Sequence, residues 1–222
     1  MDVENFLPLL KAALDNVPQN YYRHELWRNR YWHQIFEANS DQANLRELRD
    51  YLDRYGERVF CYELYHQVRV LMEQHYRKNS ISEDDDVLFQ AELKKDQLQD
   101  VSQYFSDQVN PLKKAYIPDF LLHAPGSFQH QELIIEVKSN PVISSSDIKD
   151  DLLKLHEFIV SYQYRMGLFL TVNTHPRRII HLIKELIESN PIEEILPYRE
   201  KILILCKPGQ NEPLQEWCLV DL

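Results

Sequence analysis

Apolar side chains recur every three to four residues through the first third of the chain, which is the spacing of one buried helix face. Pro18 interrupts this pattern, and Gly56 suits the left-handed residue just past a helix end. We therefore expect an N-terminal helical region over residues 1–56 and a core over residues 57–222 that opens with a long helix. The expected helices cover residues 6–14, 21–38, 41–55 and 57–78.

After residue 86 the apolar residues come in short runs, which is typical of buried strands. Two helices alternate with these runs. One begins at the caps offered by Ser144 to Asp147 and reaches Met166 before Gly167, and the other covers residues 177–189. Helices interleaved with strands predict an α/β fold built on one central sheet. The expected strands cover residues 87–93, 116–122, 133–138, 168–172, 202–206 and 217–222.

The composition is that of a cytoplasmic globular protein. Of the 222 residues, 44% are hydrophobic, and no run approaches the roughly 18 apolar residues that a membrane span needs. The N-terminus lacks the basic and then apolar segments of a signal peptide. The three cysteines form no CxxC pair and lie among apolar neighbours, so we expect buried thiols in a reducing compartment. They are Cys61, Cys206 and Cys218.

Three charged residues lie in two neighbouring predicted strands. Glu136 and Lys138 are two apart, so their side chains point to the same face of the sheet. Asp119 lies in the strand before, and it can meet Glu136 if the two strands pair. Carboxylates hold a divalent cation against a phosphate, and a nearby lysine orients water and stabilises the charge of the transition state. The pattern favours metal-dependent cleavage of phosphodiester bonds.

A plainer interpretation makes Glu136 and Lys138 an exposed ion pair on an edge strand. Against it, the preceding residues 133–135 are Leu-Ile-Ile, which is typical of a buried strand. Aspartate is also a poor strand former, so Asp119 needs a reason to stand in an apolar strand. We therefore prefer the functional interpretation of these three residues.

The Ile-Pro-Asp of residues 117–119, followed by the Glu-Val-Lys of residues 136–138, resembles the signature of the PD-(D/E)xK nuclease superfamily. This superfamily includes restriction endonucleases, Holliday-junction resolvases and RecB-type exonuclease domains. The resemblance covers about residues 57–173. It implies a restriction-endonuclease-like core, with a mixed central sheet flanked by helices, and a nuclease for which DNA is favoured over RNA as the substrate.

The resemblance also implies roles for individual residues. Asp119, Glu136 and the main-chain carbonyl of Val137 would bind Mg²⁺ or Mn²⁺, and Lys138 would orient water and stabilise charge. Many members add a glutamate from the helix before the first strand, and Glu63 stands in that place, although it could equally point to solvent.

The helix after the signature often adds a polar residue that faces the site. Asp151, Lys154 and Tyr162 are the candidates in this chain, and for Asp151 and Lys154 a solvated helix face is the plainer alternative. A further segment, residues 21–32, mixes arginine with aromatics. Such a helix can stack bases, but we prefer a core helix whose arginines reach outward.

The net charge of −10 is unusual for a protein that binds nucleic acid by charge. Residues 57–110 carry six basic and eleven acidic groups, whereas residues 111–165 carry six and seven. A catalytically inactive scaffold or interaction subunit therefore stays open as an alternative, as does a homodimer or a protein partner. For the nuclease, we expect the basic residues of 111–165 to form a positive rim. They are Lys113, Lys114, Lys138, Lys149, Lys154 and Arg165.

Overall fold

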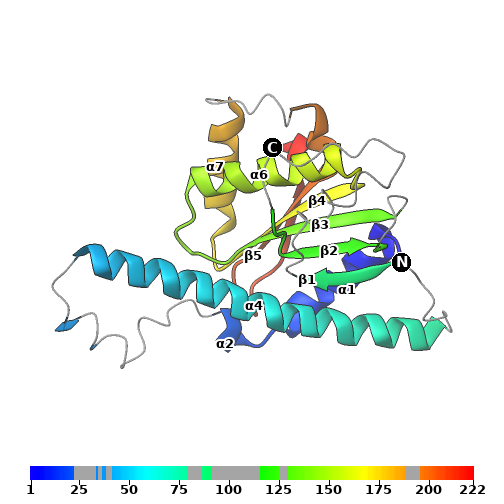
Figure 1. The fold of residues 1–222 in the computed structure, drawn as a ribbon, viewed down its shortest axis with the longest axis horizontal. Coiled ribbons are helices and arrows are strands. Elements are labelled where there is room, and N and C mark those ends of the chain that lie inside the picture. Colours follow the sequence, from blue (N-terminus) through cyan, green and yellow to red (C-terminus); the bar gives the residue numbers. More distant parts are fainter. Residues whose placement is uncertain are drawn as a thin grey trace.

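The computed structural model describes residues 1–22, 34, 37–38, 42–79, 87–91, 116–125, 130–188 and 196–222. A six-stranded mixed sheet runs through the middle of the molecule, and its strands lie side by side in chain order (Figure 1). The first three strands pair antiparallel, the third to fifth pair parallel, and the last pairs antiparallel. The strands are β1 (Leu88–Ala91), β2 (Phe120–His123), β3 (Gln131–Lys138), β4 (Met166–Val172), β5 (Ile202–Lys207) and β6 (Gln215–Cys218).

Helices cover both faces of this sheet, as the sequence predicted for an α/β fold. In Figure 1, α6 and α7 lie on one face, and α1 and α4 lie on the other. The helices are α1 (Val3–Asn16), α2 (Gln19–Tyr22), α4 (Gln42–Asn79), α6 (Ser145–Ser161) and α7 (Pro176–Glu188), with 3-10 turns η2 (Leu196–Lys201) and η3 (Leu219–Asp221). None of the helices in the described part of the chain is long and apolar enough to cross a membrane.

The alternation of side chains along β3 divides the core into two halves. Leu133, Ile135 and Val137 belong to the apolar cluster that also holds buried residues of α1 and α4. Ile134 belongs to the cluster under α6 and α7. Because alternate residues of a strand face opposite sides, every even-numbered position from Ile134 onward faces α6.

One continuous helix, α4, replaces the two helices expected over residues 41–55 and 57–78. Gly56 lies inside it and is buried, so the predicted helix end is wrong. Glycine costs only about 1 kcal/mol relative to alanine inside a helix, and burial of Leu52 and Phe60 on either side outweighs that cost. The expected boundary at residue 56 therefore passes through α4. Residues before this boundary also pack against the sheet, since the ring centroid of Phe6 in α1 lies 5.0 Å from that of Phe89 in β1.

The sequence also predicted that Gly167 ends α6, and this prediction is wrong. The helix ends at Ser161, and Gly167 is the second residue of β4, where it pairs with Ile134 and Ile202. A Cβ at Gly167 would lie 3.2 Å from the Cβ of Leu155, so the glycine allows α6 to pack closely on the sheet. The prediction of a cap at the other end is confirmed. Ser144 caps α6 through a reciprocal capping box with Asp147.

Several sequence predictions need smaller corrections. Strand β2 begins at Phe120, so Asp119 stands just before it and not inside it. The last strand, β6, ends at Cys218, and a 3-10 turn follows. Cys61 and Cys206 are buried as expected, whereas Cys218 is half-buried. Most of the helix expected over residues 21–38 lies outside the described residues, as do Lys113 and Lys114.

Candidate functional site

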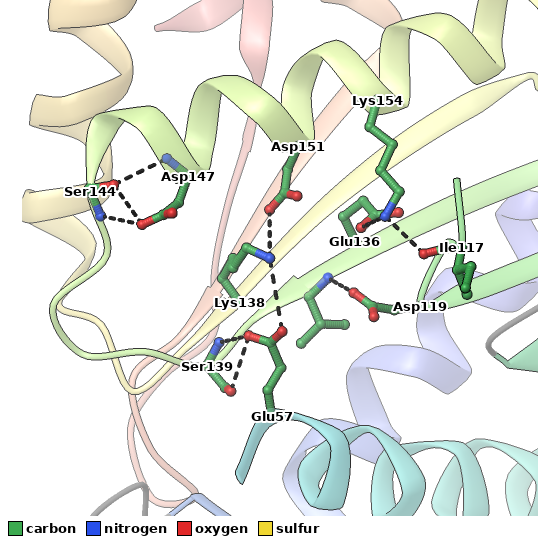
Figure 2. Close-up of polar contacts among 11 residues, drawn as sticks. Glu57, Ile117, Asp119, Glu136, Lys138, Ser139, Ser144, Asp147, Asp151 and Lys154 are labelled. Atoms are coloured by element: carbon green, nitrogen blue, oxygen red, sulfur yellow. Dashed lines mark hydrogen bonds and ion pairs between the residues drawn. The ribbon is translucent and has the colours of Figure 1, made fainter. Parts of the chain in front are cut away.

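The three charged residues of the predicted site meet at the carboxyl end of β3. Strand β2 pairs with β3 so that Phe120 lies opposite Ile135, and one further step of this register brings Asp119 to Glu136. The backbone N–H of Val137 donates a hydrogen bond of 2.7 Å to Oδ2 of Asp119 (Figure 2). Glu136 and Lys138 both point to the α6 side, as their spacing predicted. This hydrogen bond directly joins the two parts of the sequence pattern, residues 117–119 and residues 136–138.

Helix α6 supplies an oppositely charged partner to each of the two β3 residues. Nζ of Lys154 lies 2.6 Å from Oε2 of Glu136, and it also donates to the carbonyl oxygen of Ile117 at 2.9 Å. Nζ of Lys138 lies 3.2 Å from Oδ2 of Asp151. Figure 2 shows both pairs between the helix and the strand. Asp151 and Lys154 therefore belong to this cluster and not to a solvated helix face.

The glutamate that α4 brings to the cluster is Glu57, which the sequence analysis did not single out. Its Oε1 lies 3.9 Å from Nζ of Lys138, and its Oε2 accepts from the backbone N–H of Ser139 at 3.2 Å (Figure 2). Glu63 lies six residues further, about 9 Å along the helix axis. Its Oε1 accepts from the side chain of Gln67 at 2.7 Å. No contact found among the described residues joins Glu63 to the cluster.

Tyr162 also lies apart from the cluster. It follows the last residue of α6, eleven residues after Asp151, which corresponds to about 16 Å along the helix. Its ring stacks on Phe158 at 5.4 Å inside the apolar core, and burial raises the pKa of its hydroxyl. The role of the Val137 carbonyl stays a prediction, whereas the N–H of the same residue holds Asp119.

Negative charge outweighs positive charge in this cluster. It contains four carboxyl groups and two ammonium groups, so its formal charge is −2 when all six are ionised. Only 2% of the Glu136 side chain and 10% of the Asp151 side chain are exposed, so little water solvates the charges. The carboxyl groups are those of Glu57, Asp119, Glu136 and Asp151, and the ammonium groups are those of Lys138 and Lys154.

This environment shifts the pKa of several groups. Burial raises the pKa of Glu57 to about 7 and that of Asp151 to about 6, although Lys138 lowers both. Burial and the neighbouring Asp119 hold the pKa of Glu136 well above its usual range. Burial alone would lower the pKa of Lys138, but the surrounding carboxylates outweigh it and raise that pKa. The cluster thus favours bound protons at its buried carboxyl groups.

The raised pKa of Glu57 predicts a pH-dependent stability. The ordinary pKa of this group is 4.5, so between about pH 4.5 and 7 the folded state holds a proton that the unfolded chain has lost. This contribution is fully present below pH 4.5 and is lost as the pH rises through about 7. Glu57→Gln cannot titrate, so its free energy of unfolding should fall less between pH 5 and pH 8 than that of the unchanged protein.

Urea denaturation at the two pH values measures this difference. Glu63→Gln, on the same helix but outside the cluster, is the matched control and should keep the full pH dependence. A Glu57→Gln protein whose stability falls as steeply as that of the control would contradict the assignment of the raised pKa to Glu57.

The donor atoms of the cluster are of the type that a magnesium or manganese ion takes, although among the described residues they are not arranged around one. Oε1 of Glu136 is buried and has no hydrogen-bond partner among the described residues, so it is an acceptor that a proton, a donor group or a cation can satisfy. Carboxylate oxygens are the ligands that these hard cations prefer. As the side chains lie, no group of three or more His, Cys, Asp or Glu in the described ranges is arranged to hold a metal ion. The ammonium groups of Lys138 and Lys154 stand between the carboxylates.

Only some of the basic residues that were predicted to form a positive rim lie near this cluster. Lys138 and Lys154 lie within it, but each is paired with a carboxylate. Arg165 precedes the first residue of β4, whereas Lys138 pairs with Thr171 at the other end of that strand. Arg165 pairs there with Glu4 of α1. Arg165 therefore does not contribute to a rim around the cluster.

Comparison of the chain with protein-family models, with curated proteins and with solved structures finds no match. The function has to be inferred from the chemistry of the cluster itself.

Proposed function

We propose that this chain is a metal-dependent nuclease that hydrolyses phosphodiester bonds of nucleic acid, with Mg²⁺ or Mn²⁺ as its cofactor. The observation that carries the proposal is the hydrogen bond from the Val137 N–H to Asp119, because it joins the two halves of the PD-(D/E)xK-like pattern. Asp119 then lies beside Glu136 and Lys138 at the end of one buried strand. DNA is the substrate that the resemblance favours over RNA.

The order of elements supports the same proposal. Helix α4, strands β1 to β3, helix α6 and strand β4 follow one another as the resemblance expects, and the sheet that they build is mixed. Asp119 lies just before β2 and residues 136–138 end β3, and the side chains of Glu136 and Lys138 face α6. A restriction-endonuclease-like core is therefore the finer description that we propose for this α/β fold.

Each residue has a distinct chemical task in this proposal. Asp119 and Glu136 would hold the ion, which supplies a Lewis acid for the phosphate and lowers the pKa of bound water. Lys138 keeps its charge at neutral pH because carboxylates surround it. Asp151 and Glu57 hold its ammonium in place. An ammonium has three N–H donors, and Glu57 at 3.9 Å lies beyond hydrogen-bond reach, so donors remain to orient water or to stabilise a phosphate oxygen.

The alternative is a catalytically inactive scaffold of the same fold. The observation in its favour is that Lys154 already neutralises Glu136, at 2.6 Å, in a chain of net charge −10. A scaffold of this kind would keep the charged cluster only for stability. It predicts that neither metal binding nor cleavage is measurable.

Incubation of the purified chain with duplex DNA, single-stranded DNA and RNA tests the two functions. We expect cleavage in Mg²⁺ or Mn²⁺ and none in EDTA. We expect Ca²⁺ to support substrate binding but little cleavage, because its looser coordination holds water and phosphate less strictly. Full activity in Ca²⁺ or in EDTA would contradict the metal-dependent mechanism. No cleavage of any substrate, together with no binding of Mn²⁺, would favour the scaffold.

A further inference from the structure

Lys154 makes the shortest ion pair of the cluster, and both of its hydrogen-bond partners are oxygen atoms. Its Nζ lies 2.6 Å from Oε2 of Glu136 and 2.9 Å from the carbonyl oxygen of Ile117. A carboxylate oxygen and a main-chain carbonyl are also typical ligands of a hard divalent cation. The ammonium thus binds two oxygen atoms of the kind that a divalent cation also binds.

The surroundings of Lys154 differ on its two sides. Only 1% of Glu136 is exposed, so this carboxylate lies deep in the protein, whereas 48% of Ile117 is exposed. The Nζ of Lys154 joins the two, and in Figure 2 the lysine reaches down from α6 to both. The Lys154 side chain is itself 14% exposed, so its ammonium is mostly buried but lies close to solvent.

We propose that Lys154 competes with the divalent cation for Glu136, so that the cation binds only when the Lys154 ammonium turns away from Oε2. The inference rests on the proposed function in one respect, since it requires a divalent cation at Glu136. Lys154 would then set the metal affinity of the cluster, which is a different task from that of Lys138.

The chemistry of the two cations makes this exchange feasible. A divalent ion carries twice the charge of an ammonium, and four carboxyl groups of the cluster attract it. The ammonium of lysine stands on a flexible four-carbon stem, so it can reach solvent beside Ile117 without movement of α6. Lys138 is held differently, by Asp151 and Glu57, and it makes no contact with Glu136 among those found. It can stay in place when the cation binds.

Titration of the full chain with Mn²⁺ in the absence of nucleic acid tests the competition, by calorimetry and by electron paramagnetic resonance. We expect the Kd for Mn²⁺ to be at least about tenfold lower for Lys154→Met than for the unchanged protein, since a site blocked nine-tenths of the time binds about tenfold more weakly. Lys149→Met, a matched control on the same helix, should change the Kd by less than about twofold, because Lys149 has no contact with Glu136 among those found.

Removal of a positive charge could tighten metal binding without direct competition, and a second measurement separates the two causes. Nuclear magnetic resonance of ¹⁵N-labelled lysine ammonium groups follows each lysine of the unchanged protein during a Mg²⁺ titration. The Lys154 signal should change with the midpoint found for binding, and it should change more than the Lys138 signal. A tighter Kd for Lys154→Met with an unchanged Lys154 signal would overturn the competition.

The remaining outcomes separate this inference from the nuclease proposal. Mn²⁺ binding to the unchanged protein, with equal or weaker binding to Lys154→Met, would overturn the competition and leave the nuclease proposal standing. Binding by neither protein would overturn both. Binding by Lys154→Met alone would support the competition, and it would favour the scaffold, because Lys154 would then keep the metal out.

Discussion

Glu136→Gln should lower the rate of phosphodiester cleavage in Mg²⁺ by at least about a hundredfold, which is the usual loss when one preorganised electrostatic group is removed from an active site. Glutamine keeps the size of the side chain and one acceptor oxygen, but it loses the negative charge that would bind the ion. The side chain is only 2% exposed, so water cannot replace that charge. The amide oxygen can still accept from Lys154, and we expect the variant to fold.

Single-turnover cleavage of a labelled DNA substrate measures the rate, and circular dichroism checks the fold. Glu63→Gln is the matched control, since Glu63 is a partly buried glutamate that hydrogen-bonds within α4 and has no contact with the cluster among those found. It should keep the rate within about twofold, as surface changes of this kind usually do. A folded Glu136→Gln protein that cleaves at the rate of the control would remove Glu136 from the mechanism.

The meeting of Asp119, Glu136 and Lys138 could be predicted because it depends mainly on local rules. Alternation along β3 puts Glu136 and Lys138 on one face, whatever the rest of the fold. Antiparallel pairing of consecutive strands then brings Asp119 to Glu136. Both rules act over a short stretch of chain, and the apolar residues around the three charges are enough to indicate the strands.

The partners of these residues depend on how distant elements pack. A helix that connects two parallel strands runs back along the sheet, so its early residues face the end of the preceding strand. Asp151 therefore meets Lys138, and Lys154 meets Glu136. On the strand an acid precedes a base, and the same order recurs on α6, which runs in the opposite direction. This arrangement puts each acid beside a base, so it was a sequence signal for the two pairs. Both helix residues were candidates from the sequence, but their partners on the strand were not predicted.

The choice between Glu57 and Glu63 depended on the path of α4. Gly56 predicted a helix end, which put Glu57 at the start of the next helix, and the resemblance implied the role for Glu63 further along that helix. In the structure, the helix runs through Gly56 and brings Glu57 to Ser139. Local propensity at one glycine is a weak signal when apolar residues continue the same buried face on both sides. Gly167 misled the prediction for a different reason, since it lies in β4 and its missing Cβ lets α6 pack closely on the sheet.

Lys138→Met should lower the free energy of unfolding by about 2 kcal/mol or more at pH 8, because loss of one member of a buried charge cluster leaves the others uncompensated. Lys138 is the cation shared by Asp151, at 3.2 Å, and Glu57, at 3.9 Å. Only 25% of its side chain is exposed, so solvent screens these contacts weakly. This prediction concerns stability alone and does not depend on the nuclease proposal.

The loss of stability should be smaller at pH 5 than at pH 8. Burial already raises the pKa of Asp151 to about 6 and that of Glu57 to about 7, and removal of Lys138 takes away the charge that lowers both. At pH 5 the two acids of the variant bind protons and need no cation. Above about pH 7 the folded variant has two options. It can ionise a buried acid that no longer has Lys138 beside it, or it can keep a proton that the unfolded chain has released, and each option lowers the free energy of unfolding.

Urea denaturation of Lys138→Met and of Lys149→Met at pH 5 and pH 8 measures the effect. Lys149 lies on α6 without an ion pair among those found, so its replacement should change stability by less than about 0.5 kcal/mol at either pH. Adding Asp151→Asn to Lys138→Met should restore part of the loss at pH 8, since it removes one of the two stranded acids. A loss of equal size at both pH values would mean that Lys138 contributes through packing of its stem and not through its charge.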